Sequence, residues 1–489
     1  MPYALVRKAK QGMSTTTTTV GTAARREDTR LNVVLAACCL GQFLVILTAS
    51  VFYIALPVIQ EAFSFDANSL LWVANSYAIV YAGFLLLGGR LADYFGRRRL
   101  FLIGIVMFTL ASLLAGLAFN ALSLIIARGL MGLGASVMAP ATLTVLGTTF
   151  TETRQRAKAF GLWGAASGSG GAVGVVVGGM FTEWLSWRWM LLINLPIGAA
   201  LFWAVARAVS ESREGDGPRK LDVPGSLSIT LGLICLVYGI AESGRQGWGS
   251  TPVTVTLAAA AILIGLFLYD QAKLAAHPLV PLEFFKNRSV SVANIIAVVA
   301  AAAMFSVFYF FTLHMHVVLG YSPIETGLAY IPLSIGVFAG ARGLSAYVGV
   351  IGPRRILLIG LSVSLAGMIW MSQAGPDATF LADLLGPSLL LGVGQGIVTT
   401  GTAMTATVNL PYHQAGLASG VLNTTRQLGG ALGLTVLVAL STAHTNSLLA
   451  SGSAARDAQS AGYMLAFVIA SAFLLLALIP ALFAPRGTR

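Results

Sequence analysis

Charge is scarce in this chain. Only 10% of its 489 residues are Asp, Glu, Lys or Arg, whereas soluble globular domains carry about 25%. Hydrophobic residues make up 56% of the chain, and the mean hydropathy is +0.82. So few charged side chains cannot cover the surface of a soluble protein of this length. The composition therefore indicates a protein with several membrane spans.

Cysteine and histidine are scarce as well. The three cysteines lie in apolar runs, and their spacing is not that of a disulfide framework or a metal site. The five histidines are scattered, which argues against a membrane-embedded enzyme with catalytic or metal-binding side chains gathered at one depth. The net charge of +12 comes from basic residues spread over short loops. We therefore expect no nucleic-acid partner and no metal or other cofactor.

Long apolar runs, by contrast, are abundant. A run of about 20 residues crosses the roughly 30 Å hydrocarbon core as a helix. Because these runs are unbroken rather than short and alternating, they favour helices over a membrane β-barrel. The sequence predicts an all-α polytopic membrane protein with fourteen spans. Their approximate positions are 32–56, 69–89, 100–118, 121–147, 157–181, 189–209, 223–243, 252–271, 290–313, 325–348, 356–373, 380–406, 417–441 and 462–484.

Basic residues are distributed unevenly between alternate loops. With the N-terminus inside, the inner loops hold most of the 30 basic residues, and the outer loops hold Arg188, Arg245 and Arg456. This bias, with an even number of spans, predicts a cell-membrane protein with both termini in the cytoplasm. Residues 1–30 are polar and lack a signal-peptide core, so they predict a disordered cytoplasmic arm.

Two short motifs recur at a nearly constant offset. The residues Gly96–Leu100 (GRRRL) resemble Gly352–Ile356 (GPRRI), and Gly170–Gly174 (GGAVG) resemble Gly429–Gly433 (GGALG). These matches pair spans 1–6 with spans 9–14 and leave spans 7 and 8 as an insertion. A duplicated membrane protein of this kind is typical of secondary transporters, whose substrate site lies near the midplane between the halves.

The duplication predicts a division of the chain into three membrane units after the arm. We expect one six-helix bundle at residues 31–210 and a second at 288–485. The inserted two-helix hairpin falls between them, at 211–287.

Five motifs together carry a family resemblance. They are Gly89–Leu100 (GRLADYFGRRRL), Trp187–Gly198 (WRWMLLINLPIG), Leu221–Gly225 (LDVPG), His277–Phe285 (HPLVPLEFF) and Gly416–Gly429 (GLASGVLNTTRQLG). This set resembles the major facilitator superfamily, and within it the fourteen-span drug:proton antiporters of the QacA/EmrB-like group. The resemblance implies export of lipophilic small molecules by alternating access, with protons and the lipid bilayer as the other partners and the proton gradient as energy source. We expect the chain to act as a monomer.

The charged turn between spans 2 and 3 is the first candidate site. Gly96 supplies the backbone freedom of a tight turn. Asp93 is expected near the start of span 3, where its carboxylate can offset the helix dipole and meet Arg97 or Arg98. The resemblance implies a latch between the two halves, whereas the alternative is a loop whose arginines only set topology. The latch candidates are Gly89, Arg90, Asp93, Gly96, Arg97 and Arg98.

Span 1 departs from the family pattern. Thr48 stands where the family has an aspartate, and Tyr53 stands where it has an asparagine. No Asp or Glu is predicted near the midplane of any span. A buried arginine in a span must pair or face water, unless it snorkels to the surface. The candidates for proton coupling or for the cavity are Thr48, Arg128, His314, His316, Glu325, Asp383 and Arg426.

Glycines in span 5 recur on one helix face at a spacing of four. Small residues there let backbones touch, and packing alone is the alternative to a role in antiport. Val175 replaces the proline of the family's antiporter motif, which removes the expected kink. The packing candidates are Gly170, Gly174, Gly178 and Gly179.

The charges within the spans suggest what the cavity accepts. Two arginines without a midplane acid predict a neutral-to-positive cavity, which fits neutral or anionic amphipathic compounds better than lipophilic cations. Aromatic side chains can stack on such compounds, although each is also an ordinary core or lipid-facing residue. The cavity candidates are Gln42, Tyr53, Trp72, Tyr77, Trp163 and Asn423.

Two other functions stay open at this point. One is a proton-coupled importer of an organic acid or nutrient, but importers mostly resemble the twelve-span branches and lack the inserted hairpin. The other is a non-transporting membrane sensor or scaffold, although no part of the chain resembles a soluble signalling domain.

Overall fold

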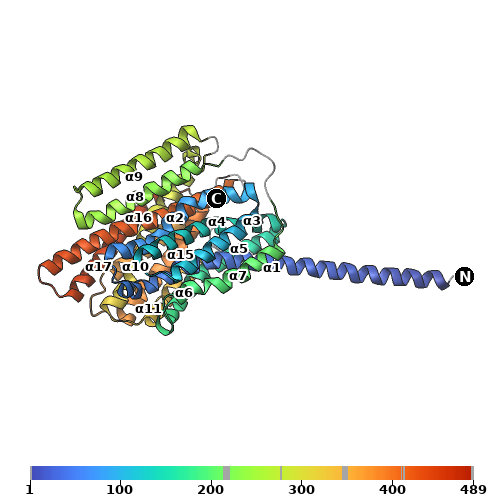
Figure 1. Ribbon diagram of the computed structural model, residues 1–489, viewed down its shortest axis with the longest axis horizontal. Coiled ribbons are helices and arrows are strands. Elements are labelled where there is room, and N and C mark those ends of the chain that lie inside the picture. The colour runs from blue at the N-terminus through green and yellow to red at the C-terminus, as the bar shows by residue number, and fades with distance from the viewer. Residues whose placement is uncertain are drawn as a thin grey trace.

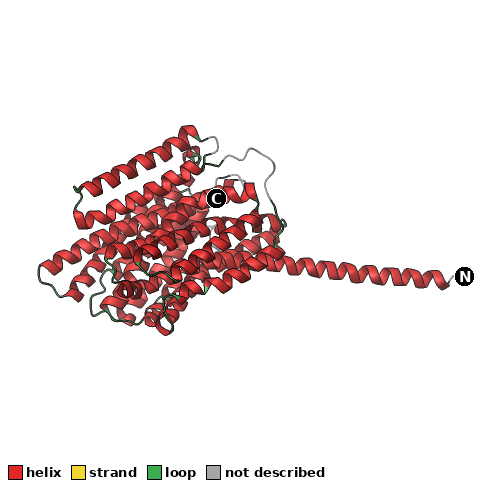
Figure 2. Cartoon of the chain, in the orientation of Figure 1, coloured by secondary structure: helices red, strands yellow, loops and turns green. Residues whose placement is uncertain are grey.

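The computed structural model describes residues 3–212, 221–275, 278–343, 351–408, 410 and 414–485, and these residues form helices and loops without a strand (Figure 2). Fourteen helices in this part of the chain are long and apolar enough to cross a membrane, which confirms the predicted number of spans.

The helices fall into three sequence groups (Figure 1). The first is α1 (Tyr3–Phe63), α2 (Ala67–Phe95), α3 (Arg97–Gly116), α4 (Ala121–Thr149), α5 (Thr153–Trp184), α6 (Trp189–Leu192) and α7 (Asn194–Ala208). The second is the hairpin of α8 (Val223–Gln246) and α9 (Thr251–Tyr269), which a π-helical turn η1 (Asp270–Leu274) extends. The third is a short 3-10 turn η2 (Leu282–Lys286), α10 (Arg288–Leu313), η3 (His314–Val318), α11 (Pro323–Ala329), α12 (Ile331–Gly343), α14 (Pro353–Met371), η5 (Phe380–Leu384), α15 (Leu385–Thr407), α16 (Ala415–Ala450) and α17 (Ala455–Ala481).

Polar side chains and glycines mark the ends of these helices. Asp66 Oδ1 accepts a hydrogen bond of 2.8 Å from a backbone N–H in the first turn of α2, and Asn120 and Ser123 form a capping box at the start of α4. Gly96, between α2 and α3, has a φ of 108°, and Gly352, before α14, has a φ of 77°. Glycine adopts such values without steric cost. The repeated motif therefore marks the same turn in both halves.

The two halves use the same helix pairings. In the N-terminal half, α1 packs on α5, α2 on α4, and α3 on both α4 and α7. In the C-terminal half, α10 packs on α16, α12 on α15, and α14 on both α15 and α17. This correspondence follows the pairing of spans that the sequence repeat predicts.

Glycines bring the paired backbones together. A Cβ added at Gly170 of α5 would lie 2.9 Å from the carbonyl oxygen of Phe43 in α1, and one at Gly178 would lie 3.0 Å from that of Val51. In the other half, Gly429 and Gly433 of α16 press in the same way on the backbone of α10. Close backbone contact replaces the hydrophobic driving force that helices lack inside lipid.

The inserted hairpin covers the boundary between the halves. Helix α8 packs on α9 and also contacts both α2 and α16. Ile79 of α2, Val237 of α8 and Ala431 of α16 belong to one buried cluster. Figure 1 shows α8 and α9 side by side on the outside of the molecule.

Helix α1 begins much earlier than predicted. It starts at Tyr3, so residues 3–30 are helical, whereas the sequence predicts a disordered arm. Figure 1 shows this segment leaving the body of the molecule as one helix. A helix that the membrane span has already nucleated can extend into the preceding residues without forming a new nucleus. A prediction from composition alone does not account for this effect.

We predict that Gly170→Leu lowers the midpoint of thermal unfolding of the purified protein by several degrees. The added side chain must push α5 away from α1, and such overpacking costs about 1–3 kcal/mol. Gly164→Leu on the same helix is the control, because no described atom lies within 4 Å of its Cβ position. Equal midpoints for the two variants would contradict the packing role.

Candidate functional site

The halves meet along a surface that we call the seam, formed by α2 with α16 on one side and α5 with α11 and α12 on the other. We call the end with the turns at Gly96 and Gly352 the basic end, and the end with the turns at Phe65 and Tyr321 the opposite end. On the α2 side, Asn75 Nδ2 donates to Thr435 Oγ1 at 2.9 Å. The amide thus pairs across the two halves inside the membrane part.

On the α5 side, the described contacts lie near the opposite end. A Cβ at Gly179 would lie 2.5 Å from the carbonyl oxygen of Pro323, at the start of α11. Glu183 Oε2 accepts a hydrogen bond of 2.8 Å from the backbone N–H of Ile324. Unlike Gly170, which faces α1, Gly179 therefore touches the other half.

Aromatic rings close the centre of the seam toward the opposite end. Tyr53 of α1 lies 5.9 Å, between ring centroids, from Phe308 of α10. Phe308 stacks on Tyr330 at 5.7 Å, and the Tyr330 hydroxyl donates to the carbonyl oxygen of Phe308 at 2.8 Å. This cluster joins both halves, and Tyr53 is the part of it that the sequence singled out.

Arg128 is enclosed within the N-terminal half. Its side chain is 2% exposed. The guanidinium carbon lies 3.9 Å from the ring centroid of Phe52 and 5.0 Å from that of Tyr77, and Nε donates to the carbonyl oxygen of Val73 at 3.4 Å. Desolvated cation–π contacts of this kind contribute about 2 kcal/mol. The arginine contacts rings rather than snorkelling to the surface, and its Nη1 is buried without a hydrogen-bond partner among the described residues.

A small cavity of about 40 Å³ lies among α10, α14, α15, α16 and α17, and Arg426 is part of its wall. One turn earlier on α16, Asn423 donates to the hydroxyl of Tyr81 in α2 at 3.3 Å. Tyr81 stacks on Tyr77 with 5.8 Å between the centroids. The structure thus brings Asn423 to the seam, while Tyr77 lies behind its partner Tyr81 and Arg426 lies one turn further along α16.

Thr48 faces the interior of its own bundle. It is 2% exposed and accepts a hydrogen bond of 3.3 Å from Asn194 Nδ2 in α7. The same amide donates to Ser112 Oγ at 2.9 Å. Asn194 Oδ1 has no partner among the described residues. The position of the family acid is therefore a packing position in this chain.

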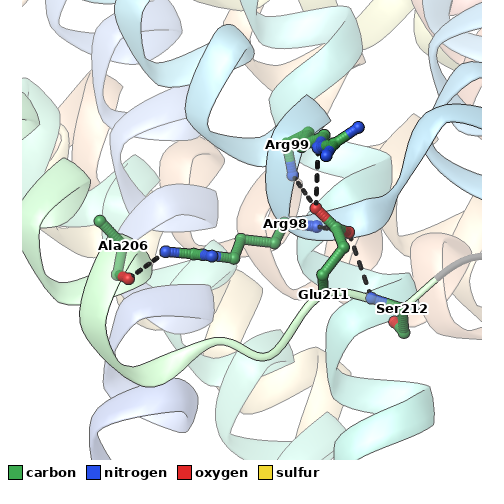
Figure 3. A network of polar contacts seen from close by, with 5 residues as sticks. All are labelled: Arg98, Arg99, Ala206, Glu211 and Ser212. Carbon is green, nitrogen blue, oxygen red and sulfur yellow. Dashed lines mark hydrogen bonds and ion pairs between the residues drawn. The ribbon is translucent and has the colours of Figure 1, made fainter.

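The start of α3 is held by a glutamate that the sequence did not single out (Figure 3). Glu211 accepts hydrogen bonds of 3.2 Å from the backbone N–H groups of Arg98 and Arg99, and its Oε2 lies 3.7 Å from Arg99 Nε. The Arg98 guanidinium donates to the carbonyl oxygen of Ala206. A carboxylate at a helix N-terminus satisfies free N–H groups and offsets the dipole.

Asp93 does not occupy the position expected for it. It lies in the last turn of α2, which ends at Phe95, rather than near the start of α3, because Gly96 ends one helix and immediately begins the next. Its side chain lies outside the described side chains. A different residue of the loop reaches across, since Arg90 Nη2 donates to the carbonyl oxygen of Pro278 at 2.6 Å. Gly89 contacts Pro140 of α4 at 3.6 Å from its Cβ position.

The remaining acid and histidine candidates lie away from Arg128 and Arg426. Glu325 forms a capping box with Ser322, and Asp383 accepts a hydrogen bond of 2.8 Å from the N–H of Thr379; both contacts are at the opposite end. His316 Nδ1 lies 2.8 Å from the carbonyl oxygen of Tyr321. His314 is fully buried, without a hydrogen-bond partner among the described residues.

Three cavity candidates have other contacts. Trp72 packs against Tyr238 of the hairpin, 6.4 Å between centroids. Trp163 Nε1 donates to Thr142 Oγ1 of α4 at 2.9 Å. Gln42 donates to Ser167 of α5 at 3.2 Å. These contacts hold Trp72 at the hairpin and the other two within the N-terminal half.

Sequence reasoning missed several residues that form the seam and the turns. Tyr81 lies four residues after Tyr77, a spacing that places both on one helix face, so this signal was present. Asn194 stands within a motif that served only for the family resemblance. Sequence reasoning also did not single out Glu242, a carboxylate residue of the hairpin helix α8 that is only 5% exposed. Glu211 follows α7 in a loop, and no local pattern connects it with α3.

A pair of repeated helical bundles that meet at a polar seam is the architecture of secondary membrane transporters. The chain belongs to the Major Facilitator Superfamily, whose family model matches residues 38–434. It is therefore a multi-pass membrane transporter rather than an enzyme, and members of this family generally need no cofactor.

Among curated proteins, the chain is similar to the cephamycin export protein CmcT of Amycolatopsis lactamdurans, with 39% identity over 90% of this chain and 88% of that protein. It is also similar to the puromycin resistance protein pur8 of Streptomyces alboniger, with 38% identity over 91% and 89% of the two chains.

Solved structures with the same fold include a bacterial homologue of the human lysosomal transporter Spinster, in an inward-facing and unoccupied conformation. Its TM-score is 0.66 at 14% identity, with 93% of this chain and 96% of that chain covered.

We predict that Thr48→Val lowers thermal stability while ligand binding and transport stay at the wild-type level. The substitution leaves the buried amide of Asn194 with one partner fewer, which costs about 1–3 kcal/mol. Thr48→Ser keeps the hydroxyl and is the control. Altered ligand affinity in a Thr48→Val protein of unchanged stability would instead place this residue in the cavity wall.

We predict that Glu211→Ala destabilises the protein by about 1 kcal/mol through loss of the cap on α3. The ion pair with Arg99 adds little, because the Arg99 side chain is 74% exposed. Glu211→Gln retains an acceptor oxygen and should lose less. Thermal unfolding at low and high salt checks this, and the difference between Gln and Glu should shrink as salt rises. A Glu211→Ala protein as stable as wild type would rule out the cap.

Proposed function

We propose that this transporter exports lipophilic small molecules of the antibiotic class, neutral or anionic, in exchange for protons. The observation that carries the proposal is the seam between the halves. Aromatic and glycine contacts close the seam toward the opposite end, and a cavity with Arg426 in its wall lies next to the seam helix α16. The similarity to proteins named for cephamycin export and puromycin resistance supports drug efflux.

The basic end is cytoplasmic in this proposal, because arginines and lysines concentrate in loops on that side. Both chain termini then lie in the cytoplasm. The inner half of α5 supports a path from that side: residues 161, 164 and 168 have no described atom within 4 Å of their Cβ positions. Together with the closed contacts at Gly179 and Tyr53, this corresponds to a state open toward the cytoplasm.

Alternating access then requires the contacts at the opposite end to separate while the basic end closes. The hydrogen bonds from Asn75 to Thr435 and from Asn423 to Tyr81 lie on the α2 side, where the hairpin covers the seam. We propose that this side acts as the pivot. The latch role stays with the turn between α2 and α3, where Arg90 reaches Pro278 and where Asp93 lies.

Proton exchange needs a titratable group that both states expose differently. His314 is our candidate, because its imidazole is fully buried without a hydrogen-bond partner among the described residues, and opening of the opposite end would expose it to water and protons. Arg128 would act on the coupling indirectly, because a fixed cation shifts the protonation of any group that approaches it.

We predict that everted membrane vesicles with an acidic lumen accumulate an exported antibiotic, and that collapse of the pH gradient by nigericin abolishes the accumulation. Reconstituted protein should also release protons when substrate is added. Arg128→Ala should lose most of this transport, because the cation between Phe52 and Tyr77 is gone, whereas the exposed Arg207→Gln should keep it. Accumulation in right-side-out vesicles would indicate an importer. Export without any proton flux would reject antiport.

A further inference from the structure

The two arginines within the spans have different surroundings. Arg128 is closed in by the rings of Phe52 and Tyr77 and by the carbonyl oxygen of Val73. Arg426 forms part of a cavity wall, and no described carboxylate forms an ion pair with it. Of the two, Arg426 is the one that lines a cavity, whereas the Nη1 of Arg128 is buried without a hydrogen-bond partner among the described residues.

The cavity at Arg426 has one polar and one apolar side. Gln395, Thr399 and Thr402 of α15 lie on its polar side together with Ser364 of α14. Ser364 is fully buried, and its hydroxyl has no hydrogen-bond partner among the described residues. An unpaired donor at this depth costs about 1–3 kcal/mol, and a ligand oxygen would relieve that cost.

The apolar side consists mostly of residues from two helices. Met304 and Phe305 come from α10, and Leu474 comes from α17. Phe305 also packs on Gly430 of α16, whose Cβ position is 2.6 Å from the ring. This side suits an apolar group, because methionine adapts its shape and phenylalanine offers a ring face.

A positive charge in this place requires a negative partner. A guanidinium within the membrane part loses most of its hydration. A carboxylate compensates best for this loss, because it accepts two parallel N–H···O bonds. The chain supplies no such partner among its described residues. The site is therefore complementary to an anion that arrives from outside.

We propose that Arg426 binds the anionic group of the transported compound, with Ser364 and the polar side chains of α15 as further hydrogen-bond partners. The preferred substrate class is a lipophilic monoanion, an aromatic ring system that bears a carboxylate. This inference rests on the proposed function for its substrate. It assigns recognition of charge to the C-terminal half and leaves Arg128 with a role inside the N-terminal half.

The position on α16 connects binding with the seam. Asn423 and Arg426 are three residues apart and lie on one face of the helix, and Asn423 donates to Tyr81 of the other half. An anion that draws the Arg426 side chain toward the cavity shifts the face of α16 that touches α2. Occupancy of the cavity and contact across the seam are thereby linked.

The test is equilibrium binding of two matched probes to the full-length protein in nanodiscs of uncharged phosphatidylcholine, followed by tryptophan fluorescence. The probes are 1-naphthoate and its neutral amide, 1-naphthamide. We expect wild type to bind naphthoate about tenfold more tightly. Arg426→Gln should abolish that preference while naphthamide binds as before, and Arg426→Lys should retain part of it. Arg207→Gln, at an exposed arginine, should behave as wild type.

An unchanged naphthoate preference in Arg426→Gln would overturn the proposal, as would its loss in Arg207→Gln. If Arg426→Gln does not fold, Gln395→Ala replaces it, and the proposal requires this variant to lose several-fold affinity for naphthoate but not for naphthamide. Export is measured separately with a neutral substrate. If Arg426→Gln keeps the naphthoate preference and the protein still exports the neutral substrate, the proposed function stands and the anion site is rejected. If the preference depends on Arg426 but the protein exports nothing, the anion site stands and the proposed function is rejected.

Discussion

Close backbone contact at glycines is the constraint on which the rest of this structure depends. Inside lipid, helices gain nothing by hiding apolar side chains from one another, so attraction comes from short contacts along their length. Gly170 and Gly178 supply them between α5 and α1, and Gly429 and Gly433 supply them between α16 and α10. These contacts make each half rigid. The polar and aromatic contacts that can break and re-form during transport lie at the seam between the halves.

At the seam, polar contacts and charges are divided between the two halves. Arg128 is enclosed within one half by rings and one carbonyl oxygen, with its Nη1 unpartnered among the described residues, whereas Arg426 in the other half lines a small cavity. Asn75 and Asn423 pair across the boundary. Neutral amides can hold this side of the seam together without the cost of burying a charge.

The turn at Gly96 joins the first half to its neighbours at the basic end. Glu211 caps α3 there, while Arg90 reaches the chain that leads to the second half. These groups are exposed or only partly buried, so solvent screens their charges and each contact is weak. Weak contacts can be made and broken within a transport cycle without unfolding the helices that carry them.

The amino-acid sequence by itself determined the membrane class, the fourteen spans, the duplication and the family. All of these follow from hydropathy, loop charge and short motifs, which are local properties. Only the tertiary structure decided that Thr48 faces Asn194, that Glu211 holds the start of α3 where Asp93 was expected, and that Arg128 is enclosed while Arg426 lines a cavity. The physical reason is that the direction of a side chain from a helix is local, but what it meets there belongs to another helix far away in the sequence.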